Sequence, residues 1–168
     1  HRDLHSFPTR RSSDLAQFVR VEVFVDTVIS AQGMVHPCSA QITRLRRQLG
    51  ADGVQLWADI QTKYTQNLLP QSIAQSAIDA KNAGADALIV TGAATGQAAP
   101  IDAVAEAKGV VSLPVYVGSG TTQSNVTQML AVADGVIVGS SLKVDGRVAN
   151  AVDAERVQSF MRAARTTS

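Results

Sequence analysis

Short apolar runs rich in β-branched residues alternate with helical stretches along residues 16–168. We expect strands over residues 19–26, 54–60, 87–91, 115–118 and 135–138, and helices near residues 39–49, 72–83, 101–108, 125–132 and 153–164. Strands that alternate with helices at this spacing indicate βαβ units and a parallel sheet. Near-continuous apolar strands suit a sheet whose outside is covered by helices.

Two phrases recur where a helix leads into a strand: AGADALIVTG and AVADGVIVGS. Repetition of this kind is typical of a (β/α)₈ barrel and equally of a doubly wound fold, so it does not choose between them. The dinucleotide fingerprint G-x-G-x-x-G after a strand is absent, and so is the G-x-x-x-x-G-K-[ST] of a P-loop. The sequence therefore offers no case for either nucleotide site.

Alternation in VRVEVFVD places four valines on one face of the first strand and Arg20, Glu22, Phe24 and Asp26 on the other. Because helices cover the outside of a barrel, we expect the charged face to look into the lumen. The next strand adds Gln55, Trp57 and Asp59 to that face, with Lys63 in the loop that follows.

Four ionisable residues of these strands and their exits are candidate catalytic groups: Glu22, Asp26, Asp59 and Lys63. Carboxylates in a confined lumen are costly unless paired, and barrel active sites lie at strand C-termini. An internal salt-bridge network with Arg20 is the alternative, and the residues leave both open. No dedicated metal motif is present, so no cofactor is evident, although carboxylate-bound Mg²⁺ remains compatible with the pattern.

The last two strands run into glycine- and serine-rich loops, which predict a phosphate site. Glycines and helix N-termini let backbone N–H groups approach an anion, and barrels often bind phosphate after strands seven and eight. The alternative is a pair of tight βα turns. The candidate phosphate-binding residues are Gly118, Ser119, Gly120, Thr121, Gly139, Ser140 and Lys143.

Several segments together resemble the BtpA (BtpA/SgcQ) family: DALIVTGAATG, LPVYVGSGTTQSNV, ADGVIVGSSLKVDG and VDAERV. The upstream stretch FVDTVISAQGMVHPCSAQITRLRRQLGADGVQLWADIQTK fits the middle of the same family. The resemblance implies a ribulose-phosphate-binding type of TIM barrel, of which these would be strands four to eight, the first three units being absent. It also implies a link to photosystem I assembly or stabilisation, without a settled reaction.

Residues 1–15, HRDLHSFPTRRSSDL, match the in-frame translation of a widely used sequencing adapter. We therefore expect a non-native tail at 1–15 and a partial, N-terminally truncated barrel domain at 16–168.

Without the tail, 12 basic residues balance 12 acidic ones, which gives no electrostatic case for nucleic acid. No apolar run approaches the ~20 residues of a membrane-spanning helix. One cysteine, Cys38, is compatible with a reducing cytoplasm.

Two functions follow as hypotheses. The first is an enzyme, isomerase- or lyase-like, that acts on a sugar- or nucleotide-phosphate. The second is a non-catalytic assembly factor for a membrane complex such as photosystem I, attached peripherally to the membrane. Either protein could form homo-oligomers.

Overall fold

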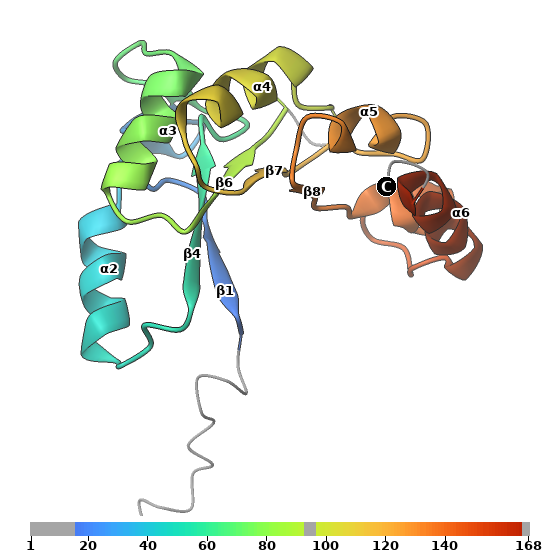
Figure 1. Cartoon of the computed structure of the whole chain (residues 1–168), viewed down its shortest axis with the longest axis horizontal. Coiled ribbons are helices and arrows are strands. Elements are labelled where there is room, and N and C mark those ends of the chain that lie inside the picture. The colour runs from blue at the N-terminus through green and yellow to red at the C-terminus, as the bar shows by residue number, and fades with distance from the viewer. Residues whose placement is uncertain (1–15, 93–96, 166–168) are drawn as a thin grey trace, which may run out of the picture.

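The computed structural model describes residues 16–92 and 97–165, so the expected foreign segment 1–15 lies outside the described residues. Its main feature is a parallel sheet with helices α2 to α5 along one side (Figure 1). The strands of this sheet are β1 (Phe18–Val21), β4 (Gln55–Ile60), β6 (Ala87–Val90), β7 (Val115–Val117) and β8 (Gly135–Val136). The helices are α2 (Ser39–Gln48), α3 (Ile73–Asn82), α4 (Ile101–Val110), α5 (Val126–Leu130) and α6 (Ala154–Arg165).

The five parallel strands lie side by side in the order in which the chain makes them, β1-β4-β6-β7-β8. A doubly wound fold would reverse its strand order at a switch point. Sequential order is instead the arrangement of a (β/α)₈ barrel, so the prediction of βα units of barrel type is confirmed.

One face of this sheet packs against the helices and forms the core. Leu56, Ile60 and Leu88 point to this side and are fully buried. Small residues of the covering helices, such as Ala77 and Ala107, let helix and sheet approach closely. Each fully buried aliphatic side chain contributes about 1.5–3 kcal/mol. The alternate side chains of every strand must therefore lie on the opposite face.

The repeated Ala-Asp phrase has a structural reason. Asp86 precedes β6, and its Oδ2 accepts a hydrogen bond from Leu56 N in β4 at 2.8 Å and pairs with Arg46 of α2 at 2.6 Å. Asp134 precedes β8 and does the same two units later, with Val115 N in β7 at 2.8 Å and Lys108 of α4 at 2.7 Å. Each aspartate thus ties a strand entrance to the adjacent strand and its helix.

The first strand is shorter than expected. β1 ends at Val21, and residues 22–26 form bends, so the two-residue alternation does not continue to Asp26. Phe24, which the pattern placed in the lumen, is instead fully buried in the core with the outward-facing side chains. That prediction was wrong because a side chain's face follows from alternation only while the backbone stays extended.

A second, small sheet was not predicted. It comprises β2 (Val28–Ser30), β3 (Gly33–Val35) and β5 (Gln66–Asn67), paired antiparallel in the order β3-β2-β5. Its strands have two or three residues, and one pairing joins segments far apart in sequence. Such short strands carry no hydrophobic period by which a sequence pattern could identify them.

The lumen-side face of the main sheet carries an aromatic stack. Trp57 lies between Phe18 and Tyr116, with ring centroids 3.8 and 4.3 Å apart. Phe18 keeps 40% of its surface exposed. In the described part of the chain, β1 and β8 each pair with one parallel strand, which leaves an open edge on either side.

We predict that the 168-residue chain self-associates over this face, because open edges and exposed aromatic rings favour pairing with another copy. Size-exclusion chromatography should give a mass above the 17.6 kDa of one chain. Phe18→Glu should weaken the association, since a carboxylate would be buried there, whereas Leu49→Glu, at a position 70% exposed beyond α2, should not. A compact monomer with a sharp, cooperative unfolding transition would contradict the prediction.

Candidate ligand-binding site

A cavity of about 660 Å³ lies where β7 and β8 end. Its walls are residues 118–122 and 137–141, together with Gly146 and Val148. Three cationic side chains complete the lining, Arg20, Lys63 and Arg156, and no carboxylate is among the described lining residues. The cavity therefore has the charge of an anion site.

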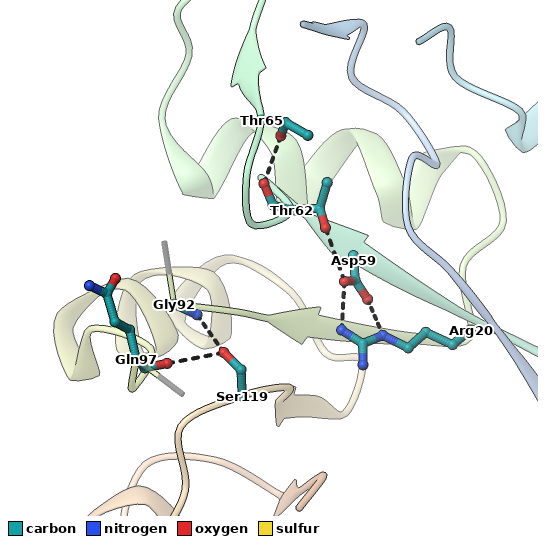
Figure 2. A network of polar contacts seen from close by, with 7 residues as sticks. All are labelled: Arg20, Asp59, Thr62, Thr65, Gly92, Gln97 and Ser119. Atoms are coloured by element: carbon teal, nitrogen blue, oxygen red, sulfur yellow. Dashed lines mark hydrogen bonds and ion pairs between the residues drawn. The ribbon is translucent and has the colours of Figure 1, made fainter. Parts of the chain in front are cut away.

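Arg20 is held by a two-pronged ion pair with Asp59. Nε donates to Oδ1 and Nη2 donates to Oδ2, both at 2.7 Å. In Figure 2 the remaining nitrogen of the guanidinium points away from Asp59, to the side on which Ser119 lies. Asp59 is 3% exposed, and Thr62 donates a longer bond of 3.4 Å to it. Paired bonds of this kind fix a guanidinium in both position and orientation.

Burial raises the pKa of Asp59 above its ordinary value, and the nearby charge of Glu22 acts in the same direction. The hydrogen bonds and charge of Arg20 oppose this rise. The same hydrogen bonds raise the pKa of Arg20, so its positive charge is secure. Asp59 is thus a carboxylate that depends on its arginine to remain ionised.

Two glycines of the β7 exit are required by packing within the protein. A Cβ on Gly118 would lie 2.4 Å from Ile89 Cγ2 and 3.1 Å from Arg20 Nη2. Gly120 has a φ of +69°, and a Cβ there would lie 2.2 Å from the backbone of Gln97. By contrast, a Cβ on Gly139 would meet nothing within 4 Å. The tight-turn interpretation therefore accounts for Gly118 and Gly120 without any ligand.

Side chains fix the loop in this shape. Ser119 Oγ accepts from Gly92 N at 2.9 Å and donates to Gln97 O at 3.1 Å, which joins the exits of β6 and β7 (Figure 2). Asn125 Oδ1 accepts from Thr122 N at 2.8 Å, and Asn125 Nδ2 donates to Gly120 O at 3.0 Å. Helix α5 has only five residues, so the loop and not a helix N-terminus shapes this wall.

Several polar groups of this wall have no partner among the described residues. The Oγ1 of Thr121 is buried and makes no hydrogen bond. The backbone amides of Ser119, Gly120, Gly139 and Ser140 donate to no other described residue either. Of these four residues Ser119 is buried, whereas Gly139 is exposed. Buried donors without partners cost free energy, and a bound ligand would satisfy them.

The structure brings together most of the residues predicted for phosphate binding, with Lys63 beside them. Lys143 is not among the lining residues: its ammonium donates to the backbone oxygen of Val148, which does line the cavity. Arg20 was expected only as a salt-bridge partner, and Arg156 was not singled out. Arg156 follows Asp153 by three residues at the start of α6 and lies 3.7 Å from its carboxylate, a spacing that could have indicated it.

The other predicted catalytic residues lie apart from this cavity. Glu22 is exposed and lines a neighbouring cavity of about 350 Å³ that Lys63 shares. Asp26 accepts from Gln71 Nε2 at 2.6 Å and from Ser76 Oγ at 3.0 Å, so it anchors the start of α3. Desolvation raises the pKa of Asp26, opposed by the Ser76 bond.

Two further searches concern the described residues only. No group of three or more His, Cys, Asp or Glu side chains in that part of the chain is arranged to hold a metal ion. None of its helices combines the length and apolar character required to cross a membrane.

We predict that Arg20→Met destabilises the fold by about 3 kcal/mol near neutral pH, because it leaves Asp59 buried without a partner. In the native protein the raised pKa means that the folded state binds the proton more tightly. The contribution of Asp59 to the free energy of unfolding therefore falls as the pH rises from about 4 through that raised pKa. Without Arg20 the pKa rises further, so the deficit of the variant should shrink as the pH is lowered to about 4.

Urea unfolding at both pH values measures this effect. Lys108→Met is the matched control, since Lys108 pairs with Asp134 at the same 2.7 Å but both side chains are about 40% exposed. Its cost should be about 1 kcal/mol or less. An equal cost for the two variants, or a deficit for Arg20→Met that does not change with pH, would contradict the assignment.

Comparison with solved structures supports the fold. The chain is similar to 3-hexulose-6-phosphate synthase from Salmonella typhimurium, with a TM-score of 0.63 and 20% identity over 93% of this chain and 65% of that one. It is also similar to N-(5'-phosphoribosyl)anthranilate isomerase from Pyrococcus furiosus, with a TM-score of 0.56 and 16% identity over 90% and 63%. At these identities the likeness shows the barrel fold alone.

Sequence comparison is more specific. The chain is 34% identical over 166 residues to the photosystem I biogenesis protein BtpA of Synechocystis, which covers 96% of this chain and 56% of that protein. It is 34% identical to an uncharacterized Thermococcus kodakarensis protein, covering 89% and 57%. The chain thus spans a little over half the length of these relatives. The model of the BtpA family matches residues 6–166, and the chain therefore belongs to the BtpA family.

Proposed function

We propose that this BtpA-family chain binds a phosphorylated small molecule, with the phosphate in the cavity at the ends of β7 and β8. The observation that carries the proposal is the lining of that cavity: Arg20, Lys63 and Arg156 surround it and no described carboxylate does. The unengaged amides of its loops and the Thr121 hydroxyl supply neutral donors beside these charges. Cationic side chains together with backbone amides are the usual means of holding a phosphate.

The ion pair explains how Arg20 serves this site. Arg20 reaches the cavity from β1, and Asp59 of β4 holds its guanidinium by two of the three nitrogens. A cation fixed in advance loses little conformational entropy when the ligand binds. Asp59 is therefore a positioning residue for Arg20, a role different from the acid–base role expected from the sequence.

Acid–base chemistry falls to Lys63 and Glu22 in this proposal. Lys63 lines the phosphate cavity and makes no ion pair with the described residues, and Glu22 lines the neighbouring cavity that Lys63 also borders. An amine and a carboxylate on either side of a bound ligand could move a proton between two of its carbon or oxygen atoms. Isomerase- or lyase-like chemistry on a sugar- or nucleotide-phosphate fits such a pair, by analogy with other barrels that bind phosphate esters.

The second candidate is a role in the assembly of a membrane complex. It is favoured by one relative, the Synechocystis protein named for photosystem I biogenesis, at 34% identity. The chain would then act as a scaffold attached peripherally to the membrane. A scaffold has no need of an anion site, so phosphate binding separates the two candidates.

We predict that inorganic phosphate binds the 168-residue chain and that Arg156→Gln weakens this binding about tenfold, because a charge-assisted hydrogen bond is worth about 1.5–3 kcal/mol. Isothermal titration calorimetry measures both affinities. Arg44→Gln, which removes an exposed arginine of α2 that does not line the cavity, is the matched control and should leave the affinity unchanged. Equal losses in the two variants, or no binding by the native chain, would overturn the proposal.

A further inference from the structure

A larger cavity, of about 820 Å³, lies next to the phosphate cavity where β4 and β6 end. The segment that follows β4, residues 61–67, forms one wall. Thr91 and Gly92 at the end of β6 form another, and Pro100 and Ala103 at the start of α4 close it. None of the predicted site residues except Lys63 lines this cavity, and neither proposed function above makes use of it.

The lining of this larger cavity is polar but almost uncharged. Lys63 is the one charged residue among the described lining residues, and most of the others carry a hydroxyl or an amide. Asp26 lies outside the lining, with its oxygens engaged by Gln71 and Ser76, and Glu22 lines the neighbouring cavity. No carboxylate is therefore among the described lining residues of the larger cavity, and Lys63 is its one cation. Hydroxyls and amides in this number suit a neutral group that both donates and accepts hydrogen bonds.

One hydroxyl of the lining is left without a partner. Thr91 is 7% exposed, and its Oγ1 makes no hydrogen bond with any described residue. A buried hydroxyl in this condition costs free energy unless something satisfies it. Thr121, in the phosphate cavity, is in the same condition. Each cavity is therefore lined by one threonine whose buried hydroxyl has no partner among the described residues.

The two cavities lie directly side by side. Lys63 lines both of them. Gly92 lines the larger one and Ser119 the smaller, and the hydrogen bond between Gly92 N and Ser119 Oγ is 2.9 Å long (Figure 2). A Cβ on Gly118 would lie only 2.9 Å from the Cγ2 of Thr91. A single small molecule can therefore span the boundary between them.

We propose that the larger cavity binds the uncharged, hydroxyl-bearing part of the same ligand, so that the substrate class is a monophosphorylated polyol or sugar. Thr91 Oγ1 hydrogen-bonds one of its hydroxyl or carbonyl oxygens. The ammonium of Lys63 lies between the phosphate and this neutral part, within reach of the carbon atoms next to the phosphate ester. This inference rests on the proposed phosphate site, and it adds specificity for the polyol or sugar to which the phosphate is attached.

The test titrates the 168-residue chain with inorganic phosphate and with D-ribose 5-phosphate as the probe for both cavities. Ribose 5-phosphate should bind at least about ten times more tightly than phosphate, because it makes additional hydrogen bonds in the larger cavity. Thr91→Val, which keeps the shape of the side chain and removes its hydroxyl, should lower the affinity for ribose 5-phosphate about tenfold and leave the affinity for phosphate unchanged. Arg156→Gln should weaken the binding of both ligands. Thr43→Val, on α2 and outside both cavities, should weaken neither.

Each outcome bears on one proposal or the other. Equal affinities of the native chain for phosphate and ribose 5-phosphate would overturn the proposed role of the larger cavity, and this comparison needs no variant. An unchanged affinity of folded Thr91→Val for ribose 5-phosphate would overturn it as well. If inorganic phosphate fails to bind, the proposed function fails, and the assignment of the larger cavity fails with it. Circular dichroism and the urea midpoint of each variant verify that it is folded.

Discussion

Burial of one face of the parallel sheet under the helices is the constraint on which the site depends. Leu56 and Leu88 point into that buried layer, and alternation then forces Trp57 and Asp59 to the other side. A shift of one residue in β1 or β4 would exchange the two sets and place the charge of Arg20 or Asp59 in the apolar layer. The large cost of that exchange keeps Asp59 of β4 opposite Arg20 of β1.

The strand ends are aligned by a second, repeated device. Asp86 and Asp134 each bind the backbone of the adjacent strand and a basic residue of the adjacent helix. These bonds fix β6 against β4 and β8 against β7, and in a parallel sheet the strand exits lie at one edge. The bond between Ser119 and Gly92 then joins two of these exits directly.

The charge of the site follows from which acids are already engaged. The charge of Asp59 is offset by Arg20, while Asp26 is hydrogen-bonded by Gln71 and Ser76, and neither side chain lines the phosphate cavity or the larger one. Lys63 makes no ion pair in the described part of the chain and borders three cavities. The proposed binding of an anion in one cavity and of a neutral polar group in the next rests on this distribution of charge. The family's relative in Synechocystis is named for photosystem I biogenesis.

The sequence by itself determined the helices and the strands of the main sheet, to within a few residues except at β1, because buried strands and amphipathic helices have distinct hydrophobic periods. It also located the glycine- and serine-rich loops that line the cavity at the ends of β7 and β8. It did not indicate the small sheet of β2, β3 and β5. Only the tertiary structure decided that β1 stops at Val21, that Phe24 joins the core and that Lys143 bonds Val148 and does not line the cavity. Those outcomes depend on contacts between segments distant in sequence, and no local pattern records such contacts.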